Sequence, residues 1–513
     1  MKKKIIKKLF QRSTSKNTNK EQSNADDIEL KKQKIHSILD DNLNLFKSIY
    51  HLPHNTDVKI RELTIRSGNR RAFIMYIATM ADSQNIQDGI VAKLIEKEDP
   101  SGKIENIASY PVFKTSSTIG DIVENLNSGI TALFIEGDPQ CYLFETTQIR
   151  GRGIESSPNE VIVKGAKEAF GEMLIDNLAL IRKKIKNENL IVESKIISKR
   201  ANNSLFIVYQ KDLVNDELLQ QVKQKIDSLD ADAIPDLSIL EQYIEARPRS
   251  LFPTILYTER PDRASAYLEE GHIVLLMENS PGCLILPATF WSLFHSPEDH
   301  YLRVPYGNFI RILRFIAMFI ALFTSSFYLA GTTFHIGMIP PDLLMAIAGS
   351  RERVPFPSLI EVLLMELAFE LIREAGLRVP SPIGPTIGIV GALILGQAAV
   401  QANIISPIII IVIALSGLSS FIVSDVSMNF AIRMTRFLFI LSAGFMGIFG
   451  ITALLVCGLF YLVSLKSFGT PYFAPMTPHY PSSKDTTIRH VPMKERFRPG
   501  YIQSKDMVKK GKD

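Results

Sequence analysis

The chain has 513 residues, with 58 Lys and Arg against 53 Asp and Glu and a formal net charge of +5, and 46% of its residues are hydrophobic. Its mean hydropathy of +0.10 is the average of a mixed-charge first half and a strongly apolar second half. Basic residues are concentrated at both ends, and in so hydrophobic a chain they do not indicate nucleic-acid binding. The three cysteines, Cys141, Cys283 and Cys457, are widely separated, which indicates neither a disulfide framework nor a zinc site.

The first 300 residues predict two soluble α/β domains behind a short tail. Residues 1–26 are basic and polar and are expected to be disordered. Residues 27–155 alternate helical segments with apolar runs at 72–80, 89–95, 129–137 and 140–146, which we interpret as strands of the first domain. Residues 156–300 show the same mixture and predict the second domain. No apolar segment of signal-peptide type follows the initial lysines, so both domains are expected on the cytoplasmic side.

Residues 301–466 predict a helical transmembrane domain, followed by a basic C-terminal tail over 467–513. Spans are expected at about 315–334, 383–402, 404–424 and 437–465, because one crossing needs ~20 apolar residues. Residues 357–373 carry carboxylates and predict an amphipathic or re-entrant helix. The basic tail favours four spans with both ends cytoplasmic, whereas a full crossing by 357–373 would place the tail outside.

Glu366, Glu370 and Glu374 follow an i, i+4, i+8 pattern that places them along one helical face. In a ring of subunits this face would repeat around an axis and concentrate cations. The alternative is a solvated acidic face, since Arg373 and Arg378 are spaced to pair with Glu370 and Glu374.

The segment 383–402 predicts a helix with two different faces. One face carries small residues that allow close helix packing in lipid, among them Gly384, Gly388, Gly391, Gly396 and Ala399. The opposite face carries Thr386, Val390, Leu393, Gln397 and Gln401, a pattern typical of a pore wall with an apolar constriction. Alternatively, each glutamine would only hydrogen-bond to a neighbouring helix.

Arg433 and Arg436, near the start of the last apolar stretch, are expected to snorkel to the interface or to orient the final span. The sequence contains no Walker motif, no GxGxxG after a strand, no HExxH and no GxSxG. We therefore expect neither an enzyme nor a bound cofactor or metal.

Long uninterrupted motifs resemble the A subunit of GerA-type spore germinant receptors. They are RPRSLFPTILYTERPDRASAYLEEGHIVLLMENSPGCLILPATFWSLFHSPEDHY at 247–301, PFPSLIEVLLMELAFELIREAG at 355–376, GALILGQAAVQANIISP at 391–407 and SLKSFGTPYFAPMTP at 464–478. The resemblance extends from about Gly165 to Pro478. The chain departs from the family pattern at Ala166, Lys183 and Lys184. A SpoVAF-like branch of the same family therefore stays an alternative.

The resemblance implies a protein of the spore inner membrane that works with a transporter-like B subunit and a lipoprotein C subunit. It also implies a homo-oligomeric ring in contact with membrane lipid, which opens to monovalent cations when a nutrient is sensed. Two other hypotheses stay open from the residues: a non-conducting scaffold that docks the partner subunits, and a solute carrier that binds substrate at Gln397 and Gln401.

Overall fold

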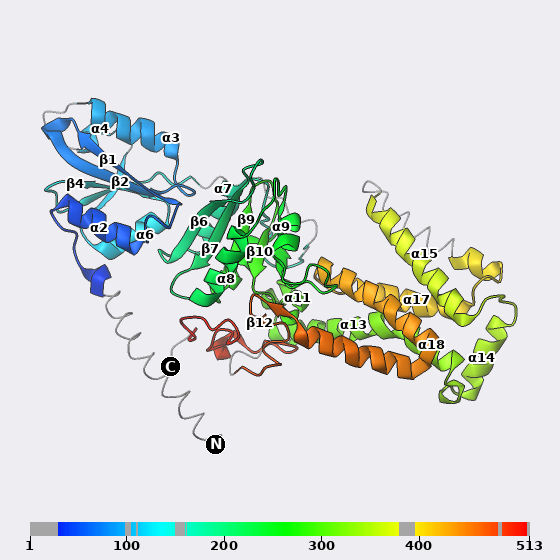
Figure 1. The fold of residues 1–513 in the computed structure, drawn as a ribbon. Helices are drawn as coiled ribbons and strands as arrows, with labels where there is room; N and C mark the ends of the chain where they lie inside the picture. The colour runs from blue at the N-terminus through cyan, green and yellow to red at the C-terminus, as the bar shows by residue number, and fades with distance from the viewer. Residues whose placement is uncertain are drawn as a thin grey trace, which may run out of the picture.

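The computed structural model describes residues 29–97, 104–108, 111–148, 160, 162–378, 396–480 and 485–509. These residues form two α/β domains and a helical bundle, after which the chain returns to the second domain (Figure 1). The predicted succession of two α/β units and a helical C-terminal part is confirmed.

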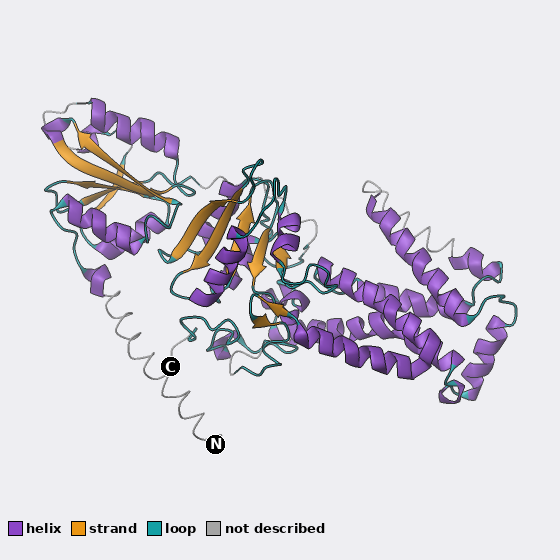
Figure 2. Cartoon of the chain, in the orientation of Figure 1, coloured by secondary structure: helices purple, strands orange, loops and turns teal. Residues whose placement is uncertain are grey.

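The first domain is a five-stranded antiparallel sheet with helices on both faces (Figure 2). Its inner strand β2 (Arg70–Ile77) carries a continuous apolar run that is buried on both sides, as expected for a strand between two helical layers. The sheet order is β1-β2-β4-β5-β3, with β1 at Val58–Ile65, β3 at Val112–Ser116, β4 at Thr131–Ile135 and β5 at Cys141–Phe144. The helical segments are α2 (Leu39–Ile49), η1 (Ser67–Asn69), α3 (Ser83–Asn85), η2 (Ile86–Val91), α4 (Ala92–Glu96), α5 (Ile104–Ile107) and α6 (Ile119–Asn127).

The run 89–95 was predicted as a strand, and this prediction is wrong: the segment is helical in η2 and α4. Ile86, Ile90 and Leu94 recur every fourth residue and are buried in the core on the second face of the sheet. That spacing fits one side of a helix, and an apolar run this short does not distinguish helix from strand.

The second domain repeats the topology of the first, with the order β6-β7-β9-β10-β8. Its strands are β6 (Leu190–Ile196), β7 (Ser204–Gln210), β8 (Leu256–Thr258), β9 (Ile273–Met277) and β10 (Cys283–Leu286). Its helices α7 (Leu174–Lys184) and α10 (Pro261–Leu268) pack on one face, and α8 (Asp216–Asp227) and α9 (Leu237–Ile244) on the other. Both sheets thus have the same pattern, in which the third strand in sequence lies at the far edge beside the fifth.

A buried contact joins the two domains. The Thr56 N–H donates to the Val192 carbonyl of β6 at 2.8 Å, and the Arg182 Nε of α7 donates to the Asp57 carboxylate at 2.9 Å. The side chains of Arg182 and Asp57 are only 1% and 2% exposed. The Thr79 hydroxyl also donates to Asp57, at 3.0 Å. The first domain is therefore anchored on the edge strand and first helix of the second.

The helical bundle follows two short helices, α11 (Phe290–Phe294) and α12 (Glu298–Tyr301). Trp291 of α11 lies in the core of the second domain. The bundle helices are α13 (Val304–Thr333), η3 (Ile336–Met338), α14 (Pro341–Arg351), α15 (Ser358–Arg378), a helical turn over 396–401, α17 (Pro407–Ser420) and α18 (Val426–Ser464). Of the described helices, α13 and α18 are long and apolar enough to cross a membrane. The expected span 315–334 falls almost entirely within α13, whereas α15 forms a continuous helix through the segment 357–373.

Helix α18 is a hairpin of two helical arms, 426–446 and 448–464, folded at Gly447. Gly447 has φ 59° and ψ −139°, a conformation open almost only to glycine. Residues at both ends of α18, Met428 and Leu465, belong to the apolar core of the second domain. At 1.5 Å per residue the arms are roughly 32 and 26 Å long. The expected span 437–465 contains this reversal, which brings the chain back to the domain it left.

After α18 the chain forms β11 (Lys466–Ser467), β12 (Thr470–Pro471) and the short turn η4 (Pro492–Lys494). The Ser467 hydroxyl donates to the Thr254 carbonyl at 2.6 Å and accepts from the Ala288 N–H at 3.1 Å. The C-terminal segment is therefore fastened to the second α/β domain.

Gly447→Ala should destabilise the bundle by about 1–3 kcal/mol, because an L-residue is strained at this φ and ψ. The added Cβ would also lie 2.9 Å from the Phe334 Cβ. The midpoint of thermal unfolding in detergent measures the loss. Gly458→Ala is the matched control on the second arm, where a Cβ meets nothing within 4 Å. Equal midpoints for the two variants would contradict the hairpin turn.

Candidate functional site in the helical bundle

Two acidic and two basic side chains meet in the middle of the bundle. Glu366 and Glu370 project from α15, and Arg433 and Arg436 from the first arm of α18. The Arg436 Nη2 lies 2.9 Å from a Glu366 carboxylate oxygen and donates to Glu370 at 2.8 Å. The Arg433 guanidinium forms an ion pair with the same Glu370 carboxylate, and its Nε donates at 3.1 Å.

Two serine hydroxyls extend this four-residue cluster to the other helices. The Ser325 Oγ of α13 donates to Glu366 at 2.7 Å. The Ser416 Oγ of α17 accepts from the Arg436 Nη1 at 3.1 Å and donates to the Ala321 carbonyl of α13 at 3.0 Å. One polar network therefore connects α13, α15, α17 and α18.

The centre of the network is fully enclosed, since Glu366 is 0% exposed and the Arg436 side chain 1%. Buried ions are tolerated only when they are paired and hydrogen-bonded, and the two carboxylates and two guanidinium groups balance in charge. The cluster thus fixes the relative positions of four helices. Each of its two carboxylates already has a guanidinium counter-ion, so neither is left free to attract a cation.

Further polar contacts hold the two ends of α15, an ion pair at one end and a hydrogen bond with a cation–π contact at the other. Glu361 is buried, pairs with Arg351 of α14 at 3.0 Å and accepts from the Ser406 N–H at 3.1 Å. The Arg373 Nη2 donates to the Ser420 Oγ at 2.8 Å, and its guanidinium lies 4.3 Å from the centre of the Phe421 ring. These contacts place α15 alongside α17, running in the same direction.

The predicted acidic face is divided between the interior and the surface. Glu366 and Glu370 point into the bundle, whereas Glu374 is exposed and pairs with Arg378 at 2.7 Å. That pair was one of the expected alternatives. Glu370, however, pairs with the arginines of α18 and not with Arg373.

Two roles were expected for Arg433 and Arg436. Snorkelling to the interface is wrong for the enclosed Arg436, whereas the contacts of both arginines agree with the other role, orienting the start of the last long helix. Arg436 is enclosed, and both arginines bind the glutamates of α15. A signal for this pairing was present in the sequence: two arginines three residues apart, at the start of an apolar stretch, need buried anionic partners or water. The glutamates of α15 were the available anions.

Most of the predicted two-faced helix lies outside the described residues, namely Thr386, Val390, Leu393, Gly384, Gly388 and Gly391. At its described end, Gly396 is buried, with Ile410 of α17 next to it, and Ala399 packs against the bundle core. Gln397 and Gln401 are exposed on the outside of the bundle. In the described part of the chain, no group of three His, Cys, Asp or Glu side chains is placed to hold a metal ion.

Comparison with known proteins decides the family. The family model described as Bacillus/Clostridium GerA spore germination protein matches residues 44–501. The chain belongs to this GerA family. Among curated proteins, it is 34% identical to spore germination protein KA of Bacillus subtilis (strain 168), over 92% of this chain and 88% of that protein.

Two further relatives of this chain come from the same organism. Spore germination protein B1 is 33% identical over 93% of this chain and 99% of its own length, and the uncharacterized membrane protein YfkQ is 32% identical over 87% and 88%. The solved N-terminal domain of the A subunit of the Bacillus megaterium spore germinant receptor GerK3 is 28% identical, with a TM-score of 0.39. That comparison covers 50% of this chain and 98% of the solved domain.

Proposed function

We propose that this GerA-family chain is the A subunit of a spore germinant receptor, embedded in the spore inner membrane as part of an ion channel that opens when a nutrient is sensed. The proposal rests first on the family and on its relatives, which are named as spore germination proteins. A nutrient-sensing B subunit and a lipoprotein C subunit are the proposed partners.

The arrangement of the helices supports a bilayer-spanning bundle. Helix α13 leads away from the second domain, α17 runs antiparallel to it, and the two arms of α18 leave and return. Large apolar side chains remain exposed on the outer surface of these helices, including Phe309, Phe319, Leu367, Ile411, Phe430 and Phe460. Such a surface is stable in lipid and unfavourable in water. Both α/β domains and the C-terminal segment would then lie on the cytoplasmic side.

The observation that carries the channel proposal is the position of Gln397 and Gln401. Both amides are exposed on the outside of an apolar bundle, while Gly396 and Ala399 of the same helix pack inward. An amide in lipid requires a polar partner, which a second copy of the chain or a water-filled pore would supply. We therefore propose a homo-oligomeric ring that conducts monovalent cations, with the helix 383–402 at its axis and membrane lipid around its perimeter.

Within this proposal the buried glutamates have a structural role. Arg433 and Arg436 already neutralise Glu366 and Glu370. The proposed pore lining is therefore the helix face that carries Gln397 and Gln401, and not the face of α15 that carries the glutamates. Replacing Glu366, Glu370 and Glu374 together by glutamine would therefore test the assembly of the bundle more than ion conduction.

Ion flux through the full-length protein in liposomes, together with its oligomeric state, tests the proposal. Gln397→Leu should reduce flux severalfold while the ring still assembles, because it removes polar groups from the pore wall. Gln242→Leu, at an exposed glutamine of α9, is the matched control and should conduct normally. A protein that forms rings yet never conducts, alone or with its B and C subunits, would favour the scaffold. Saturable solute uptake would favour the carrier.

A further inference from the structure

Residues 485–496, the C-terminal strap, pass beside the start of the first bundle helix. The Arg489 N–H donates to the Asn308 amide oxygen of α13 at 2.8 Å, and the Asn308 Nδ2 donates back to the Arg489 carbonyl at 3.0 Å. The Arg489 side chain is buried, and its Nη1 donates to the Asp299 carbonyl of α12 at 2.6 Å. These bonds fix the strap at the level of Asn308.

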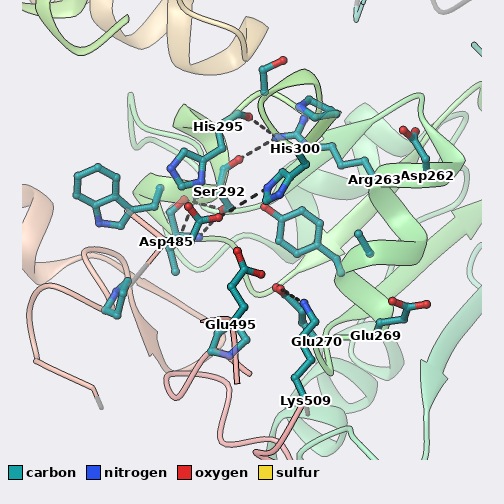
Figure 3. Close-up of a pocket in the computed structure, with 18 of the residues that line it drawn as sticks. Asp262, Arg263, Glu269, Glu270, Ser292, His295, His300, Asp485, Glu495 and Lys509 are labelled. Atoms are coloured by element: carbon teal, nitrogen blue, oxygen red, sulfur yellow. Dashed lines mark hydrogen bonds and ion pairs between the residues drawn. The ribbon is translucent and has the colours of Figure 1, made fainter. Parts of the chain in front are cut away.

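The inner side of the C-terminal strap faces the second α/β domain. A cavity of about 240 Å³ lies there, and Figure 3 shows Asp485 and Glu495 among the side chains that line it. Asp485 pairs with Arg311 of α13 and lies 3.7 Å from the His300 Nε2. Both carboxylates of the strap therefore lie on the side of the cavity.

The exposed side chains of the C-terminal strap are apolar and basic. Met493 is 79% exposed, Ile488 52% and Val491 44%. Lys494 follows Met493 directly and is exposed, as is Arg303 at the N-cap of α13. Neither cation forms an ion pair with a carboxylate in the described part of the chain. Three large apolar groups within six residues, beside unpaired cations, indicate a surface that contacts something other than water.

The first turns of α13 place this surface at the edge of the apolar part of the bundle. Arg311 and Arg314 point into the protein, where both bind the Asp299 carboxylate. The outward side chains of the same turns are apolar, with Phe309 60% and Ile312 45% exposed. The apolar outer surface of α13 therefore begins near Phe309, even though two arginines interrupt the sequence there.

Asn308, which holds the C-terminal strap, directly precedes Phe309. In a bilayer that covers the apolar surface of α13, the strap would lie at the depth of the lipid headgroups, a layer roughly 5–7 Å thick on each side. Segments with apolar and basic side chains at this depth insert the apolar groups at the boundary and attract anionic lipid to the cations.

We propose that the C-terminal strap and the start of α13 bind anionic phospholipid at the cytoplasmic surface of the membrane. Lys494 and Arg303 pair with the phosphate groups, and Met493 and Val491 lie among the upper parts of the acyl chains. The inference rests on the proposed embedding of the bundle in a membrane. A zwitterionic headgroup has no net negative charge for the two cations, so the site selects anionic lipid.

Arg489 connects this surface to the bundle. Its backbone is held by Asn308, and its side chain binds the carbonyl of Asp299, whose carboxylate in turn pairs with Arg311 and Arg314. Lipid bound to the C-terminal strap would therefore steady the position of the first bundle helix.

An environment-sensitive label on the C-terminal strap provides the measurement. Full-length Met493→Cys protein, with the exposed Cys457 replaced by serine, is labelled with bimane and reconstituted in lipid nanodiscs; Cys141 and Cys283 are buried and should not react. As phosphatidylglycerol replaces phosphatidylcholine, the bimane emission should shift saturably to shorter wavelengths. Gln224→Cys, at an exposed position of α8, is the matched control and should show no shift.

Removing two cations tests the selectivity. Arg303→Gln with Lys494→Gln should raise severalfold the phosphatidylglycerol fraction that gives half of the shift, because each basic residue near an anionic surface contributes about fivefold in affinity. Lys59→Gln with Lys97→Gln removes the same charge from exposed positions of the first domain and should leave the titration unchanged. Circular dichroism establishes that both double variants are folded.

The outcomes separate this inference from the proposed function. Protein that does not insert into nanodiscs would contradict the proposed function, and this inference with it. Inserted protein whose Met493 label shifts equally in the two lipids, or in neither, would overturn the anionic-lipid site alone. A folded Arg303→Gln, Lys494→Gln protein that titrates like the unmodified chain would also overturn it.

Discussion

Arg436→Met should destabilise the helical bundle by about 3–5 kcal/mol, because it leaves Glu366 enclosed without its counter-ion. The Arg436 Nη2 is the cation nearest Glu366, at 2.9 Å, and Glu366 has no exposed surface. Arg433 would still pair with Glu370. Reversible unfolding in sodium dodecyl sulfate, followed by far-UV circular dichroism, measures the change.

The double variant Arg436→Met with Glu366→Met separates ion pairing from loss of packing. Replacing both members of a buried pair by apolar side chains is often neutral or stabilising, so the double variant should recover most of the lost stability. Arg378→Met, which breaks the exposed pair with Glu374, should leave the unfolding curve almost unchanged. A double variant no more stable than Arg436→Met alone would show that the arginine acts through its packing.

Arg182→Met should likewise cost about 3–5 kcal/mol and should loosen the first α/β domain from the second. The Asp57 carboxylate would keep only the Thr79 contacts in a site that is 2% exposed. Limited proteolysis of the full-length protein should then cleave between the domains earlier than in the unmodified chain. Thermal unfolding gives the size of the loss.

Arg71→Met is the comparison for this interface, since Arg71 pairs with Asp40 on the exposed surface of the first domain. Its midpoint should match that of the unmodified chain. Faster proteolysis in both variants would mean that the first domain is destabilised generally and that the contact between domains is not the cause.

The sequence predicted the order of the domains well, because the α/β domains and the helical bundle differ in the length and charge of their apolar segments. Apolar runs such as that of β2 identify buried strands, and the charge-free stretch of α13 identifies a long apolar helix. The segment around Ile90 and Val91 was wrongly predicted as a strand because it is short. Its helical spacing is visible only when the residues before it, which continue the same spacing, are included. The identical strand order of the two domains was not foreseen, since it depends on long-range pairing that local patterns do not encode.

The site was predicted only in part, for a similar reason. Spacing along one helix placed Glu366 and Glu370 on a common face, yet it could not show that Arg433 and Arg436, more than 60 residues later, face them. The reversal at Gly447 was missed because glycine is common in apolar helices and no proline or charged residue marks the turn. The pairing and the reversal both depend on tertiary contacts, whereas the sequence predicted only the type and the polarity of each segment.

The hairpin of α18 connects the second α/β domain with the opposite end of the bundle. Both of its arms are rooted in the core of the second α/β domain, so rotation of that domain would carry them together as one stiff body. The loop at Gly447 would then move through a larger arc than the roots, and Phe334, at the end of α13, lies directly against it. A small displacement on the domain side would reach the opposite end of the bundle without any helix changing its length.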